Sequence, residues 1–320
     1  MKTVIHNRLT SWLAMSVIAL PSLLFASSKI KVVTSLPDLA DIAQRIGGER
    51  VTVEALAKGY QDPHFVDAKP STVLKLRDAD IFVQVGLDLE IGWVPPLLET
   101  ARNRKIYFGG EGHVDASQGI RLLQVPTGDP AQLRSQGDIH IYGNPHYWLD
   151  PINGKLIANN ICARLVELSP DDQSSFTANL RTFEHQVDSA MAVWAGKLEP
   201  FRGTEIVAYH NSWPYFENRF GLRIADFVEP KPGIPPSPGH LVALINLMEE
   251  RNIKVIIISP YFDDRPAKSL AERTGAEVVY VAPSVGAFKE VKSYFDLFDY
   301  NVNALLGAFK RQGVTGKNAG

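Results

Sequence analysis

The chain has 320 residues, of which 45% are hydrophobic and 21% are charged, and its formal net charge is −2 at pH 7. This length and composition are sufficient for two domains with hydrophobic cores and exclude a disordered chain. The net charge is slightly negative, whereas nucleic-acid-binding proteins typically carry an excess of basic residues, so we expect no nucleic-acid partner.

Residues 1–28 are predicted to be a secretory signal peptide. Lys2 and Arg8 are their only charges, and the apolar run between Arg8 and the small residues near Ser28 is too short and interrupted for a spanning helix. Cleavage near Ser28 would remove Lys2 and Arg8 and no acidic residue, which changes the formal net charge from −2 to −4. The only cysteine, Cys162, is far from this boundary and is interpreted as a small core residue of a helix. We therefore expect an exported, soluble periplasmic protein that is not a lipoprotein.

Residues 29–168 are predicted to form a first α/β lobe. Short β-branched runs alternate here with helical patterns, which favours parallel strands flanked by helices. The strand-like runs are IKVVT (30–34), VTVEAL (51–56) and DIFVQVG (80–86). The Gly- and Pro-rich residues 109–151 are interpreted as an irregular surface excursion.

Residues 169–202 are predicted to form one long connecting helix. Ser169 and Pro170 supply its start, and Pro200 with Gly203 stops it. About thirty residues at a rise of 1.5 Å make roughly 45 Å, enough for a stiff rod between two lobes. An apolar stripe indicates burial but no particular partner, so a core helix of one lobe fits the periodicity equally well. The stripe consists of Phe176, Leu180, Phe183, Val187, Met191, Trp194 and Leu198.

Residues 203–320 are predicted to form a second α/β lobe, because the same alternation recurs there. Ser237 and Pro238 are suited to begin a helix as cap and first residue. The strand-like runs are EIVAY (205–209), LRIADF (222–227), KVIIIS (254–259) and EVVYV (277–281). The fold class is thus α/β, with two lobes of mostly parallel sheet joined by one long rigid helix.

Three of the eight histidines occur in similar settings, just after a strand-like run or loop and among prolines and aromatic residues: His64, His146 and His210. Ligands of α/β sheets collect at the carboxyl ends of strands, so these side chains could converge. These histidines are far apart in the sequence, so their spacing does not form a local metal-binding motif. A single histidine in such a setting is more often a surface residue or a hydrogen-bonded residue than a ligand. If they converge, three neutral imidazoles favour Zn²⁺, whereas Mn²⁺ would favour carboxylates.

The segment NPHYWLDP (144–151) holds one of these histidines stiffly. Pro145 fixes the backbone before His146, and the cluster Tyr147-Trp148-Leu149 is expected to anchor it against a lobe. Asp150 could orient an imidazole through a hydrogen bond, but capping of the following helix is the favoured role.

Several motifs in a fixed order carry a resemblance to a known family. They are DPHFVDAKPS (62–71), VQVGLDLEIGW (83–93), NPHYWLDP (144–151), YHNSWPYFENRFGL (209–222) and PPSPGHL (235–241). Over nearly the whole mature chain, the sequence resembles the substrate-binding proteins of bacterial zinc and manganese ABC importers, the group that contains the high-affinity zinc uptake binding protein.

The resemblance implies two α/β lobes joined by a single long helix, with the metal between the lobes. It also carries the family's first three ligands onto His64, His146 and His210. The implied function is capture of Zn²⁺ in the periplasm and delivery to an inner-membrane ABC permease, with Mn²⁺ as the alternative ion. We expect the protein to be a monomer and not an enzyme.

The family's usual fourth ligand, a late carboxylate, does not carry over, because Pro283 occupies the corresponding stretch. Asp264, Glu229, His140 or a water molecule could complete the shell instead, or the metal preference could differ from that of the family. The His-rich loop of many zinc-binding members is absent as well, although His140 is close enough to the NPHYWLDP segment to be an auxiliary contact.

Two other functions compete with transport. Three histidines and an open position also describe a catalytic zinc, which predicts a periplasmic hydrolase. No helical metalloprotease motif and no evident general base accompany them. A two-lobed protein for an organic ligand, such as a siderophore or a vitamin, would not require three histidines.

Overall fold

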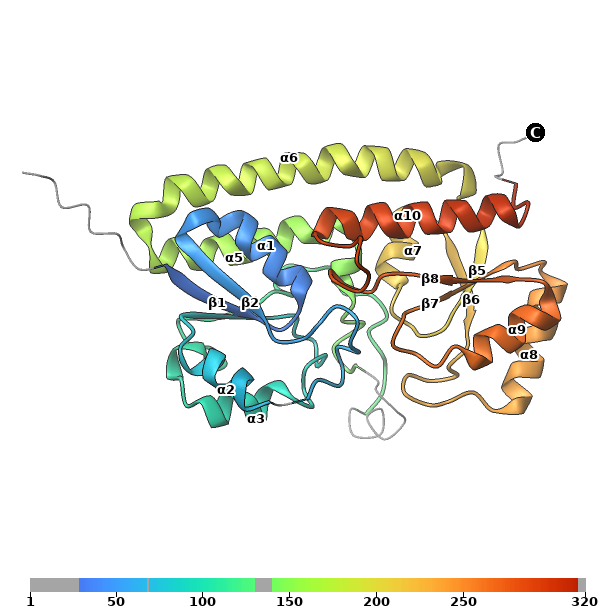
Figure 1. Ribbon diagram of the computed structural model, residues 1–320, viewed down its shortest axis with the longest axis horizontal. Coiled ribbons are helices and arrows are strands. Elements are labelled where there is room, and N and C mark those ends of the chain that lie inside the picture. Colours follow the sequence, from blue (N-terminus) through green and yellow to red (C-terminus); the bar gives the residue numbers. More distant parts are fainter. Residues whose placement is uncertain (1–28, 68, 130–139, 316–320) are drawn as a thin grey trace, which may run out of the picture.

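Two four-stranded parallel sheets form the two halves of the molecule (Figure 1). The computed structural model describes residues 29–67, 69–129 and 140–315, and the predicted signal peptide lies outside them. The first sheet has the order β2-β1-β3-β4, with β1 Ile30–Thr34, β2 Val51–Ala55, β3 Ile81–Gln84 and β4 His113–Asp115. The second has the order β6-β5-β7-β8, with β5 Glu205–Ala208, β6 Arg223–Phe227, β7 Val255–Ile258 and β8 Glu277–Tyr280. The two sheets therefore share one topology.

Strand β4 corrects the interpretation of residues 109–151 as wholly irregular. It has three residues and pairs in parallel with β3, where Phe82 is opposite His113. A run this short carries no periodic signal, and its pairing partner supplies the order that its own sequence lacks.

Helices connect and cover the strands, and proline opens most of them. A proline lies in the first turn of α1, α2, α3, α5, α7, α8 and α9, where its missing N–H leaves no hydrogen bond unmade. As predicted, Ser237 caps α8 by accepting a hydrogen bond from the His240 backbone N–H. The helices are α1 Pro37–Gly47, α2 Pro70–Arg77, α3 Val94–Ala101, α5 Pro151–Leu168, α7 Pro214–Phe220, α8 Pro238–Glu250, α9 Arg265–Thr274 and α10 Tyr294–Arg311.

The long connecting helix is confirmed as α6, Gln173–Leu198, which extends over both halves (Figure 1). Short 3-10 turns, Pro170–Asp172 and Glu199–Phe201, flank it. Its predicted apolar stripe faces α1, α5 and α10. Five members of the stripe are fully buried, namely Phe176, Phe183, Val187, Trp194 and Leu198.

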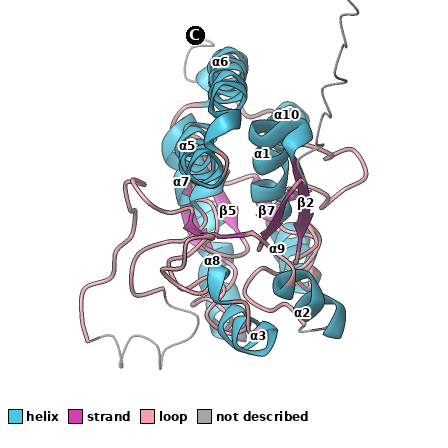
Figure 2. Ribbon diagram, turned by 90° about the vertical axis from the view of Figure 1, so that its left-hand side faces the viewer, coloured by secondary structure: helices cyan, strands magenta, loops and turns pink. Residues whose placement is uncertain are grey.

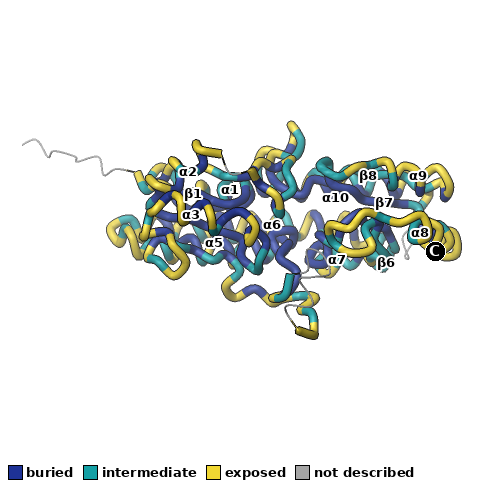
Figure 3. Tube along the Cα trace, turned by 90° about the horizontal axis from the view of Figure 1, so that it is seen from below, coloured by how far each residue is buried: buried dark blue, intermediate teal, exposed yellow. Residues whose placement is uncertain are grey.

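The C-terminal helix α10 packs against α6, against β8 of the second sheet and against α1 of the first half. Figure 2 shows α10 beside α1 and α6. One hydrophobic cluster therefore runs from the first sheet through α1, α6 and α10 to one face of the second sheet, and a second, smaller cluster fills the other face. Figure 3 shows buried segments in both halves and along α10. The fold class is confirmed, while the boundaries 29–168, 169–202 and 203–320 stay a prediction.

Within the described residues, no helix is both long and apolar enough to span a membrane. Cys162 is buried in α5, as predicted, and burial raises the pKa of its thiol.

Candidate metal centre

The structure brings His64, His146 and His210 together from three distant segments. His64 lies in the loop after β2, His146 precedes a 3-10 turn at Tyr147–Leu149, and His210 follows β5. One ring nitrogen from each lies within 4.8 Å of the others, and the ring centroids are 5.3, 5.5 and 5.7 Å apart. This geometry is what a single metal ion requires of side chains that share it.

Two of the histidines are held by the same local motif, Asx-Pro-His. Asp62 Oδ1 accepts hydrogen bonds from the backbone N–H of His64, at 3.0 Å, and from its Nδ1, at 2.7 Å. Asn144 Oδ1 accepts the equivalent pair from His146, both at 3.0 Å. These two positioning residues were not predicted, although the recurrence of DPH and NPH in the sequence is a local signal for them. An oxygen two residues before the histidine fixes both backbone and ring.

The third histidine takes its partner from the segment that follows a neighbouring strand. His210 Nδ1 lies 2.7 Å from Oε2 of Glu229, just after the end of β6, and both side chains are at most one-tenth exposed. The ring of Phe262 stacks on that of His210, with centroids 5.5 Å apart. Because Glu229 is nineteen residues away in sequence, this contact depends on the pairing of β5 with β6.

These hydrogen bonds select one nitrogen on every ring. When Nδ1–H donates to Asp62, Asn144 or Glu229, the lone pair of that ring is on Nε2, which is the nitrogen left to bind an ion. Among the described residues, His146 Nε2 is buried and has no hydrogen-bond partner. A buried polar nitrogen left in this way is costly unless something binds it, so the site fits a cation.

Burial sets the charge state of His146. It lowers the pKa of His146 well below the ordinary value, and the charges of His64, His210 and His140 lower it further. Burial alone would raise the pKa of Asp62, but hydrogen bonds and charge from His64 bring it below its usual range. At neutral pH, His146 is therefore a neutral ligand that needs to lose no proton, beside a carboxylate that is ionised.

The residues after His146 brace it against both halves of the molecule. The Tyr147 hydroxyl donates to the Val85 carbonyl of the first half at 2.6 Å, and Trp148 Nε1 donates to the Pro283 carbonyl of the second at 3.0 Å. The ring of Trp148 also contacts that of His146.

Asp150 has the predicted capping role. Its Oδ1 accepts a hydrogen bond from the Ile152 N–H at the start of α5, and its carboxylate forms an ion pair with Arg219.

The proposed sources of a fourth ligand have different positions. Asp264 is hydrogen-bonded to the Tyr280 hydroxyl and paired with Lys268, and Glu229 already holds His210. Pro283 contributes its carbonyl to Trp148. No carboxylate belongs to the ligand group formed by the three histidines, as far as the chain is described.

His140 does reach the cluster. Its Nε2 lies 3.1 Å from Nε2 of His64, and the two rings are stacked with centroids 5.1 Å apart. Burial, followed by the charges of His64 and His210, lowers the pKa of His140 to about 3. His140 is therefore a neutral imidazole beside the other three.

The sequence and the fold match known proteins. The family described as "Zinc-uptake complex component A periplasmic" matches residues 32–308. The chain belongs to this family. It is 30% identical to the high-affinity zinc uptake system protein ZnuA of Yersinia pestis, covering 83% of this chain and 87% of that protein. It is 24% identical to the manganese ABC transporter substrate-binding lipoprotein PsaA of Streptococcus pneumoniae, covering 88% and 89%.

A solved structure of a zinc-bound ZnuA deletion mutant superimposes with a TM-score of 0.72 at 25% identity, covering 91% of this chain and all of that one. Members of the zinc-uptake family are substrate-binding proteins of ABC importers and not enzymes. The chain is thus a metal-binding substrate-binding protein whose ligand is a divalent ion, and the hydrolase alternative has no support.

Proposed function

We propose that the chain binds Zn²⁺ through His64, His146 and His210 and delivers it to an ABC permease in the inner membrane. The observation that carries this proposal is the convergence of three ring nitrogens within 4.8 Å, together with the buried Nε2 of His146, which has no hydrogen-bond partner among the described residues. Each imidazole is held through Nδ1, so Nε2 can meet an ion with little reorganisation.

The ligand types favour zinc over manganese. Imidazole nitrogen suits a borderline cation that accepts tetrahedral geometry, whereas Mn²⁺ prefers carboxylate and water oxygens. In this site the carboxylates of Asp62 and Glu229 bond to Nδ1 of His64 and His210 instead. Both ions occur among relatives, since one named relative takes up zinc and another belongs to a manganese transporter.

The proposed cellular location of the protein follows from the same function. A binding protein that hands an ion to an inner-membrane permease has to work outside that membrane, so we place it in the periplasm as a soluble monomer. The proposal includes removal of residues 1–28 as a signal peptide.

Zinc titration of a His146→Ala variant tests the proposal. We expect zinc affinity to fall by orders of magnitude, because an interior ligand is lost while its supporting shell remains. Isothermal titration calorimetry measures the affinity, and circular dichroism verifies that the variant is folded.

His185→Ala is the matched control, because His185 is an exposed histidine on α6 and should leave zinc affinity unchanged. Unchanged affinity in His146→Ala would remove this residue from the site and the proposal with it. A wild-type protein that prefers Mn²⁺ in direct competition would overturn the choice of ion.

A further inference from the structure

We propose that His140 is the fourth ligand of the bound ion, so that the shell consists of four imidazoles and takes its last member from the loop before the NPHYWLDP segment. This inference rests on the proposed function, because it concerns the same ion. In this proposal His140 takes the place of the carboxylate that the resemblance implied near the end of the chain. The corresponding stretch of this chain contains Pro283.

The distance between His140 and His64 suits two ligands of one ion. Their Nε2 atoms are 3.1 Å apart. A tetrahedral zinc with Zn–N bonds of about 2.0–2.1 Å separates its ligand nitrogens by about 3.4 Å. An ion placed between these two nitrogens would therefore replace their mutual hydrogen bond with little change in their separation.

His140 approaches the cluster from the side of His64. Its ring centroid is 5.1 Å from that of His64 but 6.2 Å from that of His146. The other three histidines already form a compact group, so His140 has to move inward to complete the shell. A metal–nitrogen bond is stronger than the hydrogen bond that it replaces, so binding of the ion favours the inward position of His140.

A tight turn fixes the position from which His140 moves. The Gly143 N–H donates to the His140 carbonyl at 3.2 Å, and the Asn144 N–H donates to the Leu123 carbonyl at 2.9 Å. Gly143 has a φ of +115°, and a Cβ there would lie 3.1 Å from the Leu123 carbonyl oxygen. A side chain at this position would strain the turn, so glycine is required to bring His140 beside the site.

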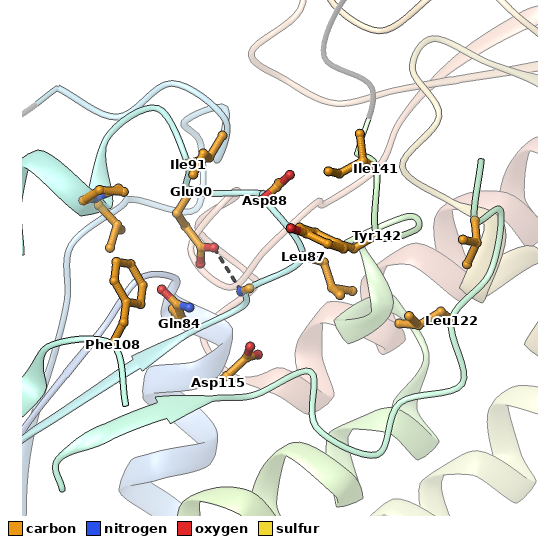
Figure 4. A pocket seen from close by; sticks show the side chains of 14 residues that line it. Gln84, Leu87, Asp88, Glu90, Ile91, Phe108, Asp115, Leu122, Ile141 and Tyr142 are labelled. Atoms are coloured by element: carbon orange, nitrogen blue, oxygen red, sulfur yellow. Dashed lines mark hydrogen bonds between the residues drawn. The ribbon is translucent and has the colours of Figure 1, made fainter. Parts of the chain in front are cut away.

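The same turn rests on the first half of the molecule. Ile141 and Tyr142, directly after His140, line a cavity of about 550 Å³, on the opposite side from Glu90 and Phe108 (Figure 4). The turn is thus placed against the first half, beside the loop that carries His64. A ligand on such a short turn can shift by a small distance without rearranging either sheet.

Ligation requires one proton to change position. In the ion-free state His64 Nδ1–H donates to Asp62, so His64 Nε2 accepts and His140 Nε2–H donates. For His140 Nε2 to bind an ion, its proton passes to water while Nδ1 takes one up. The ring stays neutral, and no net proton is released from His140.

Zinc K-edge X-ray absorption of the zinc-loaded mature protein tests the inference by counting imidazoles. We expect four in the wild type and three, with one oxygen from water, in His140→Ala. Visible absorption of the Co²⁺-loaded proteins should show tetrahedral intensity in both, with a shifted band in the variant. Zinc affinity of His140→Ala should fall at least about tenfold, since a lost ligand costs no less than a lost outer hydrogen bond.

His140→Gln separates ligation from hydrogen bonding, because glutamine can still donate to His64 but is a poor zinc ligand. We expect it to lose affinity as His140→Ala does. Full affinity in His140→Gln, or three imidazoles in the wild type, would overturn the assignment of His140 and leave the proposed function standing. Zinc affinity that survives His146→Ala would instead overturn the proposed function itself.

Discussion

At the scale of single residues, the site depends on the residues that accept hydrogen bonds from the imidazoles as much as on the imidazoles themselves. Asp62 and Asn144 act through the repeated Asx-Pro-His motif, and Glu229 acts from the segment just after β6. An acceptor on Nδ1 fixes the tautomer and the orientation of a ligating histidine and raises the basicity of its other nitrogen. These three residues touch no ion, but they decide where the ring nitrogens point.

Glu229→Gln should weaken zinc binding by about 10- to 100-fold, because glutamine keeps the shape of the partner but loses the charge that favours the Nδ1–H tautomer of His210. The melting temperature should change little. Calorimetric titration measures the affinity, and Glu272→Gln on the exposed surface of α9 is the matched control. Equal affinities for the two variants would show that Glu229 does not tune the site.

At the scale of elements, α6 holds the halves together with α10 as its partner. Trp194 of α6 is buried, its ring centroid lies 5.1 Å from that of Phe298, and its Nε1 donates to Asp299 at 2.8 Å. The connecting helix is therefore one of a packed pair, and α10 returns from the second sheet to lie along it. This pairing makes the joint between the halves stiffer than a single exposed rod.

Trp194→Ala should destabilise the protein by about 3–5 kcal/mol, because a buried indole is replaced by a cavity between α6 and α10. Trp194→Phe should cost about 1 kcal/mol, since the ring packing remains and Asp299, which is exposed, can bond to water instead. Urea denaturation measures both. Similar losses for the two variants would indicate that the hydrogen bond, and not the packing, dominates.

At the scale of the whole molecule, the segment after β8 forms a seam between the halves. Pro283 accepts from Trp148, Ser284 donates to Asp38 of α1, and the Val285 N–H donates to the same carboxylate at 3.0 Å. Tyr294, at the start of α10, donates through its hydroxyl to the Trp148 carbonyl. The stretch around Pro283, for which the resemblance implied a late carboxylate, therefore joins the two halves.

Asp38 makes this seam sensitive to pH. Burial raises its pKa from 3.8 to about 7, against the opposing effect of the hydrogen bonds from Ser284 and Val285. Between these values the folded state keeps a proton that the unfolded state has released. Stability from this group is therefore fully present below about pH 4 and is lost progressively as the pH rises to about 7, by up to about 4 kcal/mol.

Asp38→Asn should remove this contribution to the pH dependence. The variant should gain stability relative to the wild type as the pH rises from 4 to 8, because asparagine stays neutral while Asp38 has to ionise in a buried site. Urea denaturation at several pH values gives the difference in the free energy of unfolding. A difference that stays constant over this range would contradict the raised pKa.

The sequence by itself determined the α/β class, the long helix and the three convergent histidines as candidates. Hydrophobic periodicity records burial locally, so α6 and the strands were predictable, as was the cap at Ser237. The Asx-Pro-His repeat was also present in the sequence as a local pattern. The three candidate ligands were identified from sequence motifs that occur in this chain in the same order as in the family that it resembles.

Only the tertiary structure decided which distant groups meet. Glu229 reaches His210 through strand pairing, β4 exists because β3 offers it an edge, and Asp264 is engaged by Tyr280 while His140 lies beside His64. Such contacts join residues far apart in sequence, and no local preference encodes them. They arise when α1 of the first half and β8 of the second half are packed against the α6–α10 pair, because that packing fixes where the loop ends come together.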